Sequence, residues 1–263
     1  MKKVNLTIMM LAMMVAALSF VACSSSGDDN SEYNGGKEEN TYSKGKRIIK
    51  RSTEIIKRSS TMEGIAKKTT NYTYDSEGRV FKMVEDENGK KTTTTFTYGD
   101  HFITRINNHN EKTEYVIENG LIVRETYGNK KMVYYTFDNG YVSQSVSNAH
   151  YIKYKWDNGD LITIEQYDNQ TDEMTSSTTY EYSNHIDIGA SIWNADDEEP
   201  LWEYKGKAPR YLPSKVIEID VKKGTITQIT YDWTIEGNYP IKRIGIGTVN
   251  EFDLKIIETF EWE

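Results

Sequence analysis

The sequence predicts an all-β protein in which many short strands form an antiparallel up-and-down meander, closed or nearly closed into a barrel-like body. Three observations lead to this prediction. A phrase headed by aromatic residues returns at positions 72, 96, 115, 135, 154 and 180, a turn signal follows most copies, and convincing helical periodicity is lacking. Self-similarity at such a period is the signature of a repetitive architecture.

Five copies begin with an aromatic-x-aromatic pair, headed by Tyr72, Phe96, Tyr135, Tyr154 or Tyr180, and the copy headed by Tyr115 has Ile117 in the second place. Because successive side chains of a strand point to opposite faces, such a pair places both rings on one face. Asp-Asn-Gly or Asp-x-x-Gly then supplies the positive φ angles that a tight hairpin needs. A β-branched stretch such as 121–123 leaves the turn. One copy therefore predicts one hairpin, with strands of about seven residues.

The basic segment 46–58 allows two interpretations, because its isoleucines stand at 48, 49, 55 and 56. This spacing could form a basic amphipathic helix that lies on a membrane. It could also form two strands, Arg47–Ser52 and Glu54–Ser59, with solvated basic side chains. We favour the two strands, because the neighbouring segments are all β.

Closure of the sheet follows from its size. At roughly ten residues per strand with its turn, residues 46–263 have room for about 16 to 20 strands. An open sheet of so many strands would curl or split into two packed layers, and its closure into a barrel removes the exposed strand edges. Outward-pointing aromatic side chains would indicate a porin-like barrel in lipid, and inward-pointing ones a barrel flattened into a sandwich-like body. Thr163 and Glu165 lie on the face that would meet lipid, and the strands are short for a membrane barrel. We therefore expect a soluble, tethered body.

The first 22 residues predict a signal peptide: Lys2 and Lys3 precede an apolar stretch at 6–17. Ala22 then precedes Cys23, the single cysteine, and this end resembles a bacterial lipoprotein signal. The resemblance implies cleavage before Cys23 and its acylation; an ordinary secreted protein with a stray thiol is the alternative. A lone cysteine excludes an intrachain disulfide framework and a thiolate zinc cluster.

Residues 23–45 are rich in Ser, Gly, Asn and acidic side chains, which predicts a flexible acidic tether. Asp28 and Asp29 resemble the acidic export tag of surface lipoproteins, although plain linker solubility also explains them. Residues 46–263 form the single repetitive β domain, with an insertion at about 183–214.

The copy that begins at Tyr72, with the sequence Tyr-Thr-Tyr-Asp-Ser-Glu-Gly-Arg-Val, resembles the tyrosine–aspartate repeat of large bacterial shell proteins. Together, the lipoprotein cysteine, acidic tag, tether and degenerate repeats resemble a family of gut-anaerobe lipoproteins, a domain of unknown function with a porin-like fold. The resemblance covers most of residues 46–263 and implies an antiparallel barrel. It supplies no catalytic residues, and the interruption at 183–214 departs from it.

Composition and motifs indicate no particular chemistry. The net charge of −8 argues against a nucleic-acid partner, which would need a basic surface. We identify no catalytic, cofactor-binding or metal-ligating residue, and His101, His109, His150 and His185 fit exposed turns. A pair of carboxylates set across a cleft would still suit a hydrolase.

The insertion at 183–214 supplies the candidate ligand surface, because long insertions on β scaffolds are often functional. Aromatic faces next to carboxylates suit stacking on sugar rings and hydrogen bonding to their hydroxyls. The candidate residues are Trp193, Asp196, Asp197, Trp202 and Tyr204. In the alternative interpretation, the loop folds back to cap the barrel end and its tryptophans are buried.

These features predict an outer-membrane lipoprotein, anchored through Cys23 and facing the cell surface, with the periplasmic face as the other possibility. The expected function is non-catalytic binding of a glycan or another extracellular polymer, and no cofactor is expected. The alternatives are a carboxylate-dependent hydrolase and a scaffold that partners an envelope protein.

Overall fold

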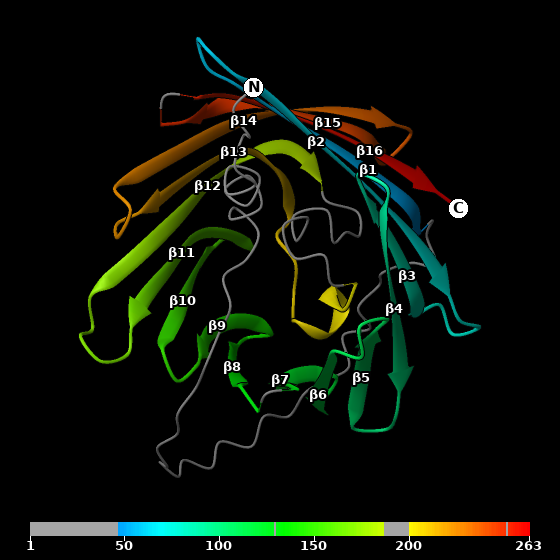
Figure 1. Cartoon of the computed structure of the whole chain (residues 1–263). Coiled ribbons are helices and arrows are strands. Elements are labelled where there is room, and N and C mark those ends of the chain that lie inside the picture. Colours follow the sequence, from blue (N-terminus) through cyan, green and yellow to red (C-terminus); the bar gives the residue numbers. More distant parts are fainter. Residues whose placement is uncertain (1–46, 129, 187–199, 251) are drawn as a thin grey trace.

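The computed structural model describes residues 47–128, 130–186, 200–250 and 252–263. These residues form one closed barrel of sixteen antiparallel strands (Figure 1). Each strand pairs with its neighbours in the chain, and β1 closes the ring by pairing with β16. The predicted up-and-down meander and its closure are confirmed.

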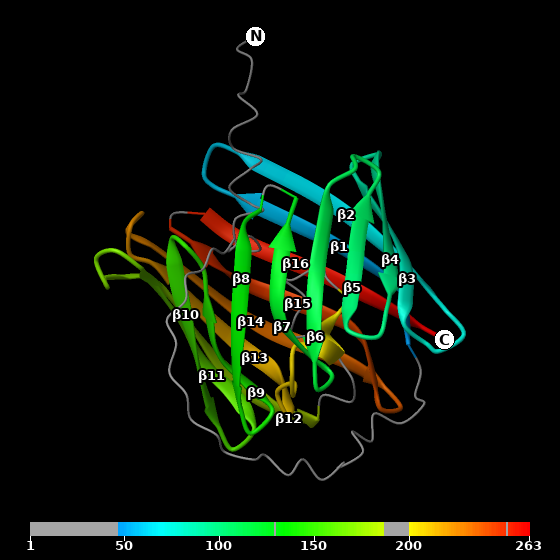
Figure 2. The ribbon, with the colours of Figure 1, turned by 90° about the horizontal axis from the view of Figure 1, so that it is seen from below.

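Short and long strands occupy different sides of the barrel. Nine strands of six to nine residues, β3 to β11, form an arch, and seven strands of ten to thirteen residues form the opposite wall (Figures 1 and 2). The short strands are β3 (Val80–Glu87), β4 (Lys90–Tyr98), β5 (Phe102–Asn107), β6 (Lys112–Glu118), β7 (Leu121–Tyr127), β8 (Met132–Asp138), β9 (Tyr141–Val146), β10 (His150–Asp157) and β11 (Asp160–Asp168). The long strands are β1 (Ile48–Arg58), β2 (Glu63–Tyr74), β12 (Met174–Ile186), β13 (Tyr211–Asp220), β14 (Thr225–Glu236), β15 (Tyr239–Val249) and β16 (Phe252–Trp262).

Residues 48–58 form the single strand β1, so both interpretations of this segment, the helix and the two separate strands, are wrong. The strand stays continuous because it pairs along its length with β2 on one edge and β16 on the other. Its adjacent isoleucines at 55 and 56 fall on opposite faces of the wall, as alternation requires. Ile55 packs on an inner apolar cluster.

The Asn-Gly turns adopt the backbone that the sequence predicts. Both turn residues have positive φ at Asn119-Gly120, Asn139-Gly140 and Asn158-Gly159. This is the type I′ geometry, whose twist matches that of the flanking strands. All three turns lie at the same end of the barrel, which also carries the connection between β12 and β13. We call it the capped end.

The lead aromatic residues point into the barrel. Phe96, Tyr115 and Tyr135 are buried in one inner cluster. The residues that directly precede and follow each of them on its strand face outward. The cluster also contains Val80, Met83, Ile103, Ile117, Ile122, Val133, Val142 and Leu201. A smaller cluster of Ile229, Tyr231 and Leu254 lies on the inner face of the long strands. The aromatic face is therefore the core of the barrel. Within the described residues, no helix has the length and apolar character needed to cross a membrane.

Candidate functional site

Residues 200–210 enter the barrel at the capped end. Figure 1 shows the 3-10 turn η2 (Trp202–Tyr204) inside the ring of strands. Leu201 is fully buried in the inner cluster, and the ring of Tyr204 lies 6.3 Å from that of Tyr98 on β4. Lys205 Nζ lies 3.5 Å from the buried carboxylate of Glu125 on β7. The segment thus packs against the inner face of the short strands.

Backbone contacts fix the rest of this segment to the hairpin turns. The amide of Lys207 donates to the carbonyl of Gly140 at 2.8 Å, and the amide of Arg210 donates to Asp160 Oδ1 at 2.9 Å. Gly206 has a φ of 95°, and a Cβ there would stand 2.7 Å from the carbonyl oxygen of Gly140. Only glycine allows this approach at positive φ. The segment therefore crosses the barrel end from β4 to the β10–β11 turn.

Of the five residues of the predicted ligand surface, the structure describes Trp202 and Tyr204. Trp193, Asp196 and Asp197 lie outside the described residues, as does Cys23, the predicted lipidation site. Trp202 begins the 3-10 turn, and the partly buried ring of Tyr204 packs against the core cluster. Tyr204 therefore faces the interior of the barrel, where a loop that folds back into the barrel end would place it.

Charged side chains surround Tyr204. Glu203 keeps contact with solvent, but partial burial raises the pKa of its carboxyl, while Arg79 and Arg47 oppose this shift. Both oxygens of the neighbouring Asp75 carboxylate accept hydrogen bonds within its own turn. Oδ1 accepts bonds from the amides of Glu77 and Arg79, and Oδ2 accepts one from Arg79 Nε, each at 2.9 Å. The arrangement closes a turn.

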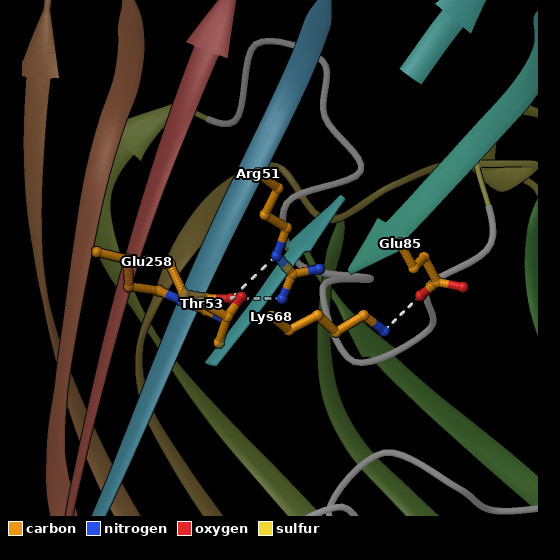
Figure 3. A network of polar contacts seen from close by, with 6 residues as sticks. Arg51, Thr53, Lys68, Glu85 and Glu258 are labelled. Carbon is orange, nitrogen blue, oxygen red and sulfur yellow. Dashed lines mark hydrogen bonds and ion pairs between the residues drawn. The ribbon is translucent and has the colours of Figure 1, made fainter. Parts of the chain in front are cut away.

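A buried ion network lies on the inner face of the long strands (Figure 3). Glu258 on β16 is 1% exposed and contacts two guanidinium groups, that of Arg51 on β1 and that of Arg243 on β15. Thr53 donates to the same carboxylate at 3.4 Å. Burial alone would raise the pKa of Glu258, but the two arginines outweigh it and lower the pKa to about 2.

Two further contacts extend this polar interior. Lys68 on β2 points across the inner face to Glu85 on β3, at 2.5 Å (Figure 3). Arg243 also lies over the ring of Tyr231, 4.4 Å from its centroid. Because buried charges are costly unless paired, these contacts hold the long strands in register.

Glu125 is the other deeply buried carboxylate of the barrel. It accepts hydrogen bonds from the hydroxyls of Tyr127 at 2.8 Å and Tyr135 at 3.0 Å, besides the ion pair with Lys205. Its oxygens, like those of Glu258, are committed to structural partners. Among the described residues, no group of three or more His, Cys, Asp or Glu side chains could hold a metal ion.

The outward-facing surface of the whole barrel, which we call the outer wall, carries charge pairs that join neighbouring strands. Four pairs lie at distances between 2.5 and 2.8 Å: Lys50–Glu261, Lys67–Glu54, Lys155–Glu165 and Lys215–Glu181. Thr163 faces outward beside Lys155, with which it is in register. The outer face is therefore predominantly polar.

One set of aromatic side chains on this outer wall was missed by the sequence reasoning. Strand register places Tyr134 (β8), Val146 (β9), Tyr151 (β10) and Tyr167 (β11) side by side. We call these four residues the tyrosine row. Tyr151 has the opposite strand parity to the lead aromatic Tyr154, and this was the only signal that it faces outward. The alignment of the four residues depends on inter-strand register.

The rings of Tyr151 and Tyr167 stack with their centroids 5.0 Å apart and their planes 6° apart. A hydrogen bond to Asp172 raises the pKa of Tyr151 to about 12, and one to Glu165 raises that of Tyr167. The ammonium group of Lys153 lies 5.4 and 5.0 Å from the two ring centroids. These contacts fix the orientation of both rings on the surface.

Comparisons with known proteins bear on the fold. No protein-family model and no curated protein matches the chain. The crystal structure of a porin-like protein from Bacteroides uniformis matches with a TM-score of 0.60 and 16% identity, over 82% of this chain and 98% of that chain. A porin-like protein from Bacteroides vulgatus matches with a TM-score of 0.51 and 12% identity over the same shares. The chain thus has the barrel fold of these porin-like proteins.

Proposed function

We propose that this chain is an outer-membrane lipoprotein whose barrel stands in the aqueous phase and serves as a non-catalytic binding module for a glycan or another extracellular polymer. The signal peptide, the Ala22-Cys23 junction and the acidic tether support the anchor. The likeness to porin-like proteins of Bacteroides supports an envelope location.

The charge of the outer wall carries the proposal that the barrel is tethered and not embedded. Lys50, Lys155 and Lys215 point away from the core and pair with carboxylates of neighbouring strands. In a lipid-facing position, each lysine near the bilayer midplane would cost about 2–4 kcal/mol. The polar outer face is instead suited to water, and a barrel in water needs a separate anchor to stay at a membrane.

The state of the buried acids favours binding over hydrolysis. General acid catalysis needs a carboxyl group whose proton is available to the substrate. Glu258 is ionised between two arginines, Glu125 is held by two tyrosines and a lysine, and Asp75 closes a turn. Glu203 has the raised pKa of a potential acid, but the neighbouring Asp75 is bound within its own turn by the amides of Glu77 and Arg79 and by the Arg79 guanidinium.

Replacing Cys23 by alanine tests the anchor. We expect the wild-type protein in the membrane fraction and the variant in the soluble fraction, with an unchanged β-sheet circular dichroism spectrum without detergent. Ser24→Ala is the matched control and is expected to remain with the membrane. A folded Cys23→Ala protein that has lost its signal peptide and still partitions fully into membranes would show that the barrel itself is embedded. The binding function is tested on a glycan array, where failure to bind any glycan or polymer would contradict it.

A further inference from the structure

The tyrosine row has the form of a ligand platform. Tyr134 is 37% exposed, and Tyr151 and Tyr167 are partly exposed. Tyr134 and Tyr151 lie on strands two positions apart, about 9.6 Å at the usual strand spacing. The smaller Val146 lies between them in register. Two large tyrosine rings therefore stand on either side of a smaller side chain on the outer face.

The row runs across the strands and can support a long ligand. It crosses four neighbouring strands, β8 to β11, in direct register. Tyr151 and Tyr167 stack on each other, so a ligand that lay along the row would meet the ring of Tyr134 and the exposed side of this stacked pair. An extended chain of repeating units fits such a line better than a single small molecule.

The polar groups beside the row indicate the chemistry of that ligand. Asp172 accepts a hydrogen bond from the hydroxyl of Tyr151, and Glu165 accepts one from the hydroxyl of Tyr167. Lys153 and Lys155 lie on the same face. A sugar ring combines an apolar face of C–H groups with a rim of hydroxyls. The negative face of an aromatic ring attracts such C–H groups. Carboxylates and ammonium groups can hydrogen-bond the rim.

Other occupants match this surface less well. A lipid surface would have to accommodate the Lys155–Glu165 pair directly beside the rings. An apolar protein interface is usually depleted of charge at its centre, whereas Lys153 lies over the stacked rings.

We propose that the tyrosine row is a carbohydrate-binding site that holds an extended polysaccharide chain across β8 to β11. This inference rests on the proposed function, because it locates the binding surface of that module. It places the surface on the outer wall, apart from the segment 200–210 at the capped end.

The experiment measures binding of the full-length protein to soluble β-glucan, xylan, galactomannan, α-glucan and pectin by affinity electrophoresis, followed by calorimetry. We expect the wild type to bind at least one polysaccharide. The Tyr151→Ala/Tyr167→Ala double variant is expected to bind it about tenfold more weakly or worse, and Tyr134→Ala also more weakly. A tenfold loss corresponds to about 1.4 kcal/mol.

Phe81→Ala is the matched control, because Phe81 is 40% exposed on the outer face of β3 and lies outside the row. Its affinity should stay within about twofold of the wild type, and thermal unfolding of every variant checks the fold. Unchanged binding by the double variant would overturn the site and leave the binding function intact. Absence of binding by the wild type would reject both.

Vesicles of phosphatidylethanolamine and phosphatidylglycerol test whether the tyrosine row binds a membrane instead of a polysaccharide. We expect no binding of the Cys23→Ala protein to these vesicles. If this protein binds vesicles in a way that depends on Tyr151 and Tyr167, and the full-length protein shows no tyrosine-dependent binding to polysaccharide, the row is a membrane contact and the proposal fails.

Discussion

Replacing Glu258 by glutamine is expected to lower the free energy of unfolding by about 3–5 kcal/mol. Glu258 is 1% exposed, and its two oxygens meet the guanidinium groups of Arg51 and Arg243 on the neighbouring strands. Glutamine keeps the shape of the side chain but removes its charge. Two buried arginines would then lack their shared counterion, and the strands on both sides of β16 would be destabilised.

Glu261→Gln is the matched control, because Glu261 lies three residues away on the same strand and faces outward. Its pair with Lys50 is exposed, and such a pair contributes about 0–1 kcal/mol. Urea unfolding followed by tryptophan fluorescence measures both variants. Equal midpoints for Glu258→Gln and Glu261→Gln would mean that the buried network does not stabilise the barrel.

The same carboxylate predicts a difference in pH dependence between the wild type and Glu258→Gln. The pKa of Glu258 lies at about 2 in the folded protein, below its ordinary value of 4.5. As the pH falls from about 4.5 to about 2, the unfolded chain binds a proton here and the folded chain does not. The stability from this group is complete above this window and lost at its lower end. Unfolding measured from pH 5 to pH 2 should therefore show a shallower loss in the variant, and parallel curves would contradict the shift.

The architecture was predictable because its signals are local. Aromatic-x-aromatic pairs define one face of a strand, and Asp-Asn-Gly defines a hairpin turn, as the positive φ angles at Asn139-Gly140 show. Segment 46–58 was harder because it carries no repeat phrase. Its continuity depends on pairing with β16, which lies almost two hundred residues away in the chain. Long-range pairing of this kind leaves little trace in a single segment.

The ion network and the tyrosine row could not be predicted for the same reason. Arg51, Arg243 and Glu258 meet only when the barrel closes, since β1 and β15 are the two neighbours of β16. The alignment of Tyr134 with Tyr151 depends on the register of β8, β9 and β10. A shift of one residue in this register would turn the shifted side chain to the other face of the sheet. Tyr204 was identified as an aromatic residue of an unusual insertion, but its contact with Tyr98 depends on where that insertion folds.

Replacing Leu201 by alanine is expected to destabilise the protein by about 2–5 kcal/mol. Leu201 is fully buried in the inner cluster of the short strands, although it belongs to the connection between β12 and β13. Shortening the side chain removes apolar contacts and leaves a cavity that the closed wall cannot collapse to fill. Ile186→Ala is the control, because Ile186 ends β12 just before this connection and is 61% exposed. Its effect should stay within about 0.5 kcal/mol.

Hydrogen exchange shows whether Leu201 supports the segment or the whole barrel. If it holds the segment inside, Leu201→Ala should speed exchange at the amides of Lys207 and Arg210, which donate to Gly140 and to Gly159 and Asp160. Amides in β14 and β15, remote from this cluster, should lose protection only in proportion to the fall in global stability. Unchanged exchange at Lys207 and Arg210, with unchanged stability, would mean that the segment does not depend on the core for its position. Because Lys205 also pairs with Glu125, selective opening of 200–210 would show that the apolar contact of Leu201, and not the ion pair, holds the segment in the barrel.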